Sequence, residues 1–389
     1  MTWASAFVDR AHDGWDDISM VGADLENEGF GLAELSQSIF AALGLPGTRN
    51  HLAFEENKRT ALVLIDGLGF KALQKYRGEF PLFKKFTEHE PLNSDFPSTT
   101  ATNLVSLGTG VHPGEHGMLG YTVRVPRSGE PGRLLNALKW DERVDPLIWQ
   151  KVPTLYERAI EDGLKISHIA EKRYEGSGFT RAGMRGAHYL GANHISEMVE
   201  KAVGAHSAEG SYSYIYLNTL DVAGHKDGVG SDSWMSALGI VAELLEGLLK
   251  RLPGQTQIYL TADHGMVNAT QKIVLGEGNA LLDNVTLIGG EARARHIYLR
   301  EGSVADTKAL WQAHFGESVE LFTKDDASQL FGKGVTEDSL DRMGDLIAVP
   351  REGIVLLDPA IAAKEGKMIG HHGGFTQDEV QIPLISYRT

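Results

Sequence analysis

The sequence predicts an α/β protein with a mostly parallel central sheet, helices on both faces of that sheet, and a smaller inserted lobe. Short apolar or β-rich runs alternate with stretches of helical periodicity, which is the pattern of strands joined by helical crossovers. In such sheets the ligand crevice lies at the carboxyl ends of the strands, and aspartates stand at or just after several of these runs. The expected strands are 61–66, 165–170, 213–220, 257–262 and 382–387.

Helical periodicity is clearest over residues 233–252. Apolar side chains recur there at three- and four-residue spacing, and the following Pro253-Gly254 pair ends the pattern. A second helix is expected at 32–43, with no associated chemistry. The apolar residues of the longer helix are Trp234, Leu238, Val241, Leu245, Leu248 and Leu252.

Chain length and composition suggest one large domain with additions. At 389 residues the chain exceeds the roughly 250–300 residues of a single core. We expect an N-terminal helical extension at 1–50, a catalytic core formed by 51–269 and 366–389, and an inserted cap or lobe at 270–365. The inserted segment is richer in charge and glycine than the core, and it breaks the strand–helix rhythm.

Composition also excludes several classes of function. The chain has no cysteine, so disulfides, thiolate zinc sites and cysteine nucleophiles are ruled out. A formal charge of −15 argues against a surface that coats nucleic acid. No apolar run is long enough to span a bilayer, and the first residues lack a basic segment followed by an apolar one. We therefore expect a soluble, cytoplasmic protein.

Potential metal ligands gather at the ends of the expected strands. Carboxylate oxygen and imidazole nitrogen suit divalent metals such as zinc, and six such residues divide into two sets of three. Taken singly, each has another interpretation: an Asp before Gly can end a strand in a turn, and an Asp and a His four residues apart can form a surface ion pair. His371 or His372 could be the ligand of its segment, and we choose His372. The six are Asp66, Asp221, His225, Asp263, His264 and His372.

The segment 96–103, Phe-Pro-Ser-Thr-Thr-Ala-Thr-Asn, offers a nucleophile. Pro97 fixes an extended entry, and a helix is expected to start near Ala101, which places Thr100 at a helix N-terminus. Free amides and the positive end of the helix dipole favour a bound phosphate there. A divalent cation can convert a threonine hydroxyl into an alkoxide. The alternative is that Thr99 or Thr100 only caps the helix.

With these residues in view, the chain resembles the alkaline phosphatase superfamily and, within it, the type I phosphodiesterase/nucleotide pyrophosphatase family. The order of the motifs carries the resemblance, which covers residue 60 to the C-terminus and is weakest across 270–365. The motifs are Asp66, Phe96-Pro97-Ser98-Thr99-Thr100, the segment Thr109-Gly110 to His116-Gly117, Asp221 with His225, Asp263-His264-Gly265 and His372-Gly373.

The resemblance implies a role for each of these residues. Thr100 would attack phosphorus to give a phosphothreonyl intermediate, and the backbone amide of Ala101 would bind the phosphate. Two divalent metal ions are implied, usually zinc in this family, with manganese and iron also accepted by such ligands. One ion would be held by Asp221, His225 and His372, and the other by Asp66, Asp263 and His264.

One departure from the family pattern bears on the substrate. The family commonly has an Asn shortly after the His-Gly of the third motif, and this chain has Tyr121 there; Asn103 is a second candidate phosphate donor. No Arg precedes Arg124 near the nucleophile segment, so diester or pyrophosphate cleavage is favoured over monoester cleavage. Three inserted-lobe residues could reverse this preference, although we expect them to form a solvated strand flank: Arg293, Arg295 and His296.

Three functional interpretations follow. The first is a metal-dependent phosphodiesterase or nucleotide pyrophosphatase acting on a small phosphate-containing substrate. The second is a phosphomonoesterase, phosphonate hydrolase or phosphomutase on the same scaffold. The third is a non-catalytic binding protein, which the full set of expected ligands and the threonine disfavour.

Overall fold

A seven-stranded, mostly parallel sheet forms the centre of the protein. The computed structural model describes residues 29–129 and 132–389. The strand order is β2-β19-β9-β1-β8-β6-β7, in which β9, β1, β8, β6 and β7 run parallel and β19 and β2 pair antiparallel at one edge. The strands are β1 (Arg59–Ile65), β2 (Thr87–Glu88), β6 (Lys165–Ala170), β7 (His188–Gly191), β8 (Ser211–Leu217), β9 (Gln257–Thr261) and β19 (Ile385–Arg388).

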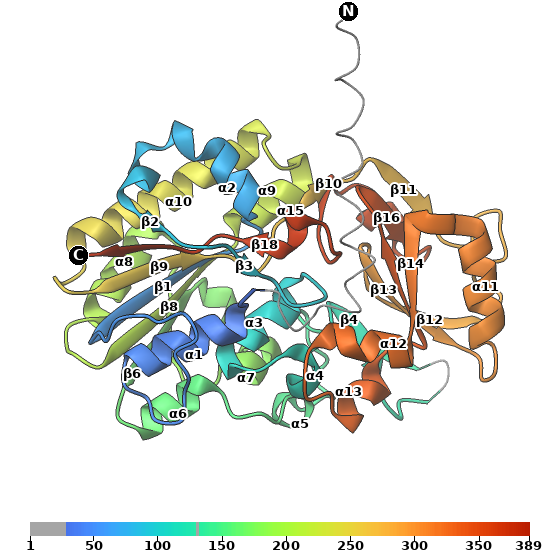
Figure 1. Ribbon diagram of the computed structural model, residues 1–389, viewed down its shortest axis with the longest axis horizontal. Coiled ribbons are helices and arrows are strands. Elements are labelled where there is room, and N and C mark those ends of the chain that lie inside the picture. The colour runs from blue at the N-terminus through green and yellow to red at the C-terminus, as the bar shows by residue number, and fades with distance from the viewer. Residues whose placement is uncertain (1–28, 130–131) are drawn as a thin grey trace, which may run out of the picture.

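Helices cover both faces of this sheet, as predicted. In Figure 1 α2 and α10 lie above the sheet, and α1, α3 and α6 lie below it. The expected helix at 32–43 is α1, whose Leu35 and Ile39 are buried in the main core. None of the described helices is long and apolar enough to cross a membrane. The helices are α1 (Leu32–Ala42), α2 (Phe70–Tyr76), α3 (Thr100–Thr109), α6 (Leu155–Glu161), α7 (Gly178–Gly183), α8 (Ile195–Ala205), α9 (Thr219–Asp227) and α10 (Asp232–Arg251).

The predicted strands are all present, with two differences at their ends. β8 stops at Leu217, so Asn218 precedes α9 and Asp221 lies on a helix rather than just after a strand. The last predicted run divides into β18 (Gln381–Ile382) and β19. Pro383 separates the two pieces because proline cannot donate a ladder hydrogen bond.

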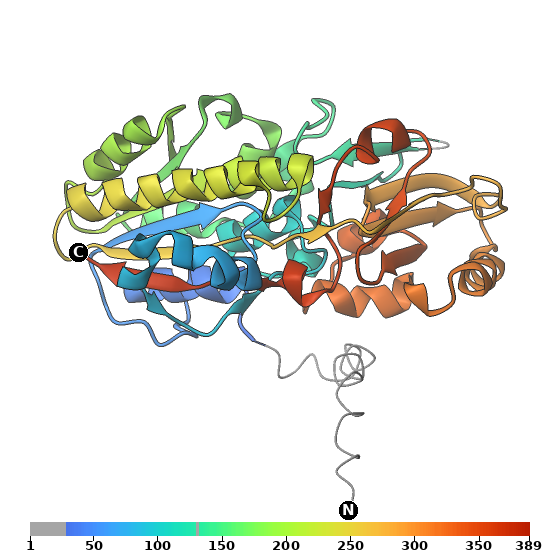
Figure 2. The ribbon, with the colours of Figure 1, turned by 90° about the horizontal axis from the view of Figure 1, so that it is seen from above.

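A second, antiparallel sheet forms a lobe beside the central sheet, at the right of Figure 2. Its strand order is β12-β13-β15-β14, and a separate cluster of buried apolar residues, including Ile297 and Trp311, lies against it. The elements of this lobe are β11 (Gln271–Val274), β12 (Val285–Glu291), β13 (Ala294–Leu299), α11 (Val304–Phe315), β14 (Val319–Thr323), α12 (Lys324–Ser328), α13 (Glu337–Arg342), β15 (Leu346–Pro350), β16 (Ile354–Leu357) and α14 (Ala362–Glu365).

Short elements connect the lobe with the central sheet. β10 pairs with β17, β3 with β18, and β4 with β5. Their bounds, with those of the remaining short helices, are β3 (Leu92–Asn93), α4 (Pro113–His116), β4 (Thr122–Val125), β5 (Arg133–Asn136), α5 (Pro146–Trp149), β10 (Val267–Asn268), β17 (Gly370–His371) and α15 (Gln377–Val380).

The prediction of a solvated flank at Arg293, Arg295 and His296 is wrong, because all three side chains are buried, with exposed fractions of 0%, 1% and 1%. Arg293 forms a two-pronged ion pair with Glu379, its Nε and Nη2 lying 2.9 and 2.7 Å from the two carboxylate oxygens. Arg295 pairs with Glu365, and His296 hydrogen-bonds a backbone carbonyl. Burial of these side chains is tolerated because each has a polar partner.

The long helix α10 gives a test of the core. Leu245 is fully buried, and Leu245→Ala is expected to lower the free energy of unfolding by about 2–5 kcal/mol because a cavity remains. Glu246→Ala is the matched control, since the neighbouring Glu246 side chain is 56% exposed. Urea denaturation followed by circular dichroism measures both. Equal losses for the two variants would contradict the assignment of this helix face to the core.

Candidate metal centre and active site

The three predicted aspartates meet at one end of the central sheet. Asp66 follows β1, Asp263 lies just beyond the end of β9, and Asp221 lies in the first turn of α9, directly after β8. Because β9, β1 and β8 are neighbours and parallel, their carboxyl ends lie side by side. The sheet order therefore brings together residues that are far apart in the chain.

Asp66, Asp263 and His264 form the first group. One ligand atom from each lies within 4.8 Å of the others. His264 Nε2 is 3.3 Å from Asp66 Oδ1 and 3.6 Å from Asp263 Oδ2, and all three side chains are buried. This is one of the two sets that the family resemblance implies.

Asp221, His225 and His372 form the second group, again with one ligand atom from each within 4.8 Å. Nε2 of His225 lies 3.3 Å from Asp221 Oδ1, and Nε2 of His372 lies 3.9 Å from the same oxygen. The rings of His264 and His372 stack with centroids 3.7 Å apart, so the two groups are adjacent. His371 belongs to neither group.

Backbone carbonyls orient the three imidazoles. Nδ1 of His225, His264 and His372 lies 2.8, 3.0 and 2.9 Å from the carbonyl oxygens of Gly370, Gly265 and Ser98. A carbonyl oxygen can only accept, so each Nδ1 carries the proton and each Nε2 is available as a ligand. This is the usual arrangement of metal-binding histidines.

The carboxylates leave acceptor capacity unused. Within the described chain, Asp221 Oδ1 and Asp263 Oδ2 are buried without a hydrogen-bond donor. Burial, followed by the charge of Asp66, raises the pKa of both carboxyls well above the usual range. Burial opposes the protonation of His264, but the surrounding carboxylates raise its pKa to about 10. These groups fit divalent cations, which would satisfy the oxygens and balance the charge.

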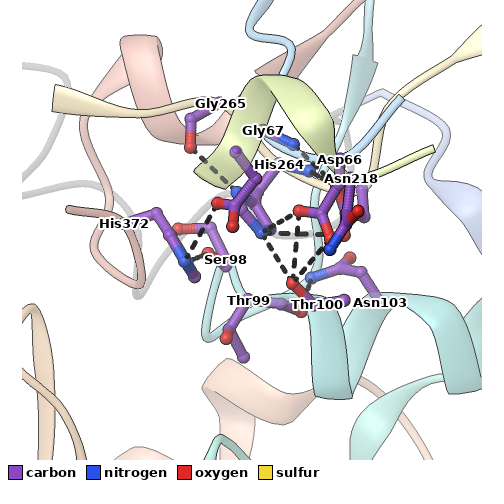
Figure 3. Close-up of polar contacts among 12 residues, drawn as sticks. Asp66, Gly67, Ser98, Thr99, Thr100, Asn103, Asn218, His264, Gly265 and His372 are labelled. Carbon is purple, nitrogen blue, oxygen red and sulfur yellow. Dashed lines mark hydrogen bonds and ion pairs between the residues drawn. The ribbon is translucent and has the colours of Figure 1, made fainter. Parts of the chain in front are cut away.

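Thr100 is the first residue of α3, and its hydroxyl faces the first group (Figure 3). Thr100 Oγ1 lies 3.1 Å from His264 Nε2 and 3.3 Å from Asp66 Oδ1. Thr99 is the residue that precedes the helix, and its side chain makes no capping hydrogen bond. The hydroxyl of Thr100 therefore contacts the ligand cluster rather than capping the helix.

Asn103, predicted as a phosphate donor, forms hydrogen bonds with the backbone of its own turn instead. Its carboxamide nitrogen donates to the carbonyls of Asp95 and Thr99, both at 3.1 Å, and its oxygen accepts from the amide of Asp95 at 2.7 Å. The side chain is fully buried. Asn103 therefore holds the turn that carries Thr100, and its hydrogen-bonding groups face that turn rather than a phosphate.

A cavity of about 610 Å³ opens beside the two groups. Thr100 and Tyr121 line it, as does His372, while Ala101 is buried in the first turn of α3. Much of the remaining lining is apolar or aromatic and comes from both the central sheet and the lobe: Leu104, Leu134, Tyr174, Phe179, Met184, Tyr214, Tyr216 and Ile288.

Three residues of this site are not among those predicted from the sequence: Tyr216, Ser98 and Glu291. The Tyr216 hydroxyl donates to Asp66 Oδ2, and Ser98 accepts from the amide of Gly373 at 3.1 Å. Tyrosines alternate along β8, and this pattern could have indicated Tyr216. Ser98 could have been found because it lies within the Phe96–Thr100 motif. Glu291, from the lobe, also lines the cavity, and no local pattern marked it.

The sequence matches a known protein family. Residues 60–375 match the type I phosphodiesterase / nucleotide pyrophosphatase family. The chain belongs to this family. The family is described by its type I phosphodiesterases and nucleotide pyrophosphatases, which are hydrolases.

The sequence is also similar to a curated protein from Schizosaccharomyces pombe. It is an uncharacterised pyrophosphatase/phosphodiesterase, 25% identical over 224 residues, or 54% of this chain. The chain spans less than half of that relative, with the match covering 45% of its length.

Two solved structures have a similar fold. An inactive threonine-to-alanine variant of murine ectonucleotide pyrophosphatase/phosphodiesterase 5, in complex with AMP, has a TM-score of 0.66 at 17% identity, over 84% of this chain and 87% of that one. Phosphonoacetate hydrolase from Sinorhizobium meliloti, in complex with phosphonoformate, has a TM-score of 0.64 at 18% identity, over 85% and 90%.

Metal content tests the choice between the two adjacent histidines. His372→Ala removes a member of the second group and is expected to lower zinc content by about one ion per chain, because three-ligand sites depend on each ligand. His371→Ala is the matched control and should keep the wild-type content. Metal analysis after dialysis against zinc measures both, and the reverse pattern would make His371 the ligand.

Proposed function

We propose that this protein hydrolyses phosphodiester or pyrophosphate bonds, with Thr100 as nucleophile and two divalent cations as cofactors. The observation that carries the proposal is the position of the Thr100 hydroxyl, 3.1 Å from His264 Nε2 and beside Asp66 at the N-terminus of α3. The inactive murine relative carries a threonine-to-alanine change, which is the change that would silence a threonine nucleophile.

The two groups supply the ligands. Asp66, Asp263 and His264 would hold one cation, and Asp221, His225 and His372 the other. This mixture of oxygen and imidazole nitrogen suits zinc best, and manganese and iron are also accepted. When bound, such cations supply positive charge that stabilises the phosphoryl oxygens and favours ionisation of the threonine hydroxyl.

The side chains and backbone around Thr100 would then have separate roles in the reaction. Asp66, within hydrogen-bonding distance of Thr100 Oγ1, gives the hydroxyl proton an acceptor as the oxygen forms a bond to phosphorus. The P–O bond to the leaving group breaks, the leaving oxygen takes up a proton from solvent, and the phosphoryl group is held as a phosphothreonine. Water then attacks phosphorus and loses a proton, the P–O bond to Thr100 breaks, and the threonine oxygen is reprotonated. Throughout, the first-turn amide of Ala101 and the helix dipole would bind the transferred group.

The cavity favours substrates with an organic group on the phosphorus. Its volume of about 610 Å³ is within the range of sites for organic ligands, and its aromatic wall includes Tyr174 and Phe179. A nucleotide or another phosphodiester fits these properties better than a small phosphonate does. Tyr121, which lines the cavity, would donate a hydrogen bond to the substrate from its hydroxyl.

Comparison of three substrates tests the reaction class. The zinc-loaded protein is expected to hydrolyse bis-p-nitrophenyl phosphate with higher kcat/KM than p-nitrophenyl phosphate, and to leave phosphonoacetate intact. Release of nitrophenol and of inorganic phosphate measures these activities. Faster turnover of phosphonoacetate would replace the proposal with a phosphonate hydrolase, and faster monoester turnover would replace it with a phosphomonoesterase.

Replacement of the nucleophile gives a second test. Thr100→Ala is expected to lower kcat by about 10³-fold or more, because the attacking oxygen is lost. Zinc content should not change, since the six ligands remain. Thr102→Ala is the matched control: the same methyl and hydroxyl change in a buried residue of the same helix, whose Oγ1 has no partner within the described chain. Near-normal activity of Thr100→Ala would exclude it as nucleophile.

A further inference from the structure

Glu291 is a buried carboxyl in the wall of the candidate active site. It ends β12 in the lobe, and it lines the same cavity as Thr99 and Thr100. Its side chain is 9% exposed. Oε2 accepts a hydrogen bond from the amide of Tyr121 at 3.0 Å, and the side chain of Thr99 also interacts with the carboxyl, whereas Oε1 is buried without a hydrogen-bond partner within the described chain. Neither metal-ligand group includes this residue.

The backbone around Glu291 is shaped to admit it. Gly373 follows His372 and has a φ of +124°. A Cβ at Gly373 would lie 2.7 Å from Glu291 Cγ, a separation that real side chains do not adopt. The amide of Tyr121 donates to the same carboxylate. The carboxyl of Glu291 is thus enclosed between two segments of the site, next to the turn that carries Thr100.

Little positive charge is free to neutralise this carboxyl. Among the cavity-lining cations, Arg295 acts on Glu291, but its Nη2 is bound to Glu365 at 2.5 Å and its Nε to the Leu356 carbonyl at 2.8 Å. The side chains of Lys139 and Lys364, which also line the cavity, are exposed. His264 of the first group also lowers the pKa of Glu291 through its charge, so a negative charge at Glu291 is only partly compensated.

We propose that Glu291 is a specificity-determining residue that selects phosphorus groups carrying one negative charge over those carrying two. A phosphodiester carries one such charge, whereas a terminal phosphate carries two at alkaline pH. Like charges in a partly enclosed site repel more strongly than in water, so a fixed carboxylate penalises the second charge. This inference rests on the proposed phosphodiesterase function and names the charge class of its substrate.

A matched pair of substrates isolates the charge. Methyl p-nitrophenyl phosphate and p-nitrophenyl phosphate share a leaving group and differ by one methyl group and one charge. Assays of the zinc-loaded full chain at about pH 9 keep Glu291 ionised, because burial raises the pKa of this carboxyl only to about 7. In Glu291→Gln, kcat/KM for the monoester is expected to rise about tenfold, while kcat/KM for the diester changes less than about threefold.

Control variants separate charge from structure. Glu320→Gln removes a lobe carboxylate that pairs with Arg351 and is not part of the cavity lining, and it should leave the ratio of the two kcat/KM values unchanged. Glu291→Ala removes the same charge as Glu291→Gln without a carboxamide, and it should shift the ratio in the same direction. Circular dichroism verifies that each variant is folded.

Each outcome bears on a different claim. Wild-type protein that cleaves neither ester would overturn the proposed function, and the role of Glu291 with it. Wild-type protein that cleaves the diester, combined with neutral Glu291 variants in which both kcat/KM values change by the same factor, would overturn the role of Glu291 alone. A rise in monoester hydrolysis confined to the Glu291 variants supports the proposal.

Discussion

Three carboxylates enclosed at one end of a parallel sheet are the constraint on which the rest of this structure depends. Asp66, Asp221 and Asp263 come from three neighbouring elements, and the unpaired oxygens on two of them lie away from solvent. Burying such charges costs free energy unless positive charge or hydrogen bonds compensate. The imidazoles of His264 and His372 stack beside these carboxylates, and a hydrogen bond from each Nδ1 to a backbone carbonyl fixes the ring orientation.

The part of the site that sequence could predict is the part set by local pattern. Asp66 and Asp263 stand just beyond apolar runs, and parallel strands place such positions together whatever the exact helix lengths. Thr100 was recognisable because a proline-led turn precedes a helix start. Even so, the end of β8 was placed three residues too late, since Leu220 continues the apolar run although the backbone has already turned into α9.

Side-chain partners, one set local and one distant, determine what the sequence could not show. Asn103 was expected to contact phosphate because amides often do, but three carbonyls of its own turn take up the carboxamide. Arg293 was expected at the surface because arginine usually is, and its partner Glu379 lies 86 residues further along the chain. Neither periodicity nor spacing encodes such a pairing, because it forms only once the lobe has packed against the central sheet.

The hydrogen bonds and ion pair of Glu379 restrict the motion of the lobe relative to the central sheet. Its carboxylate binds Arg293 of the lobe and the amide of Gly374, two residues beyond His372, while its carbonyl accepts from the amide of Gly265, next to His264. Hinged opening at this seam would separate a buried ion pair, at a cost of about 3–5 kcal/mol if one charge is left unpaired. Glu379 therefore holds the lobe and the turns of His264 and His372 in a fixed relative position. We expect substrate to enter and leave through a permanently open cavity mouth, without a hinge motion of the lobe.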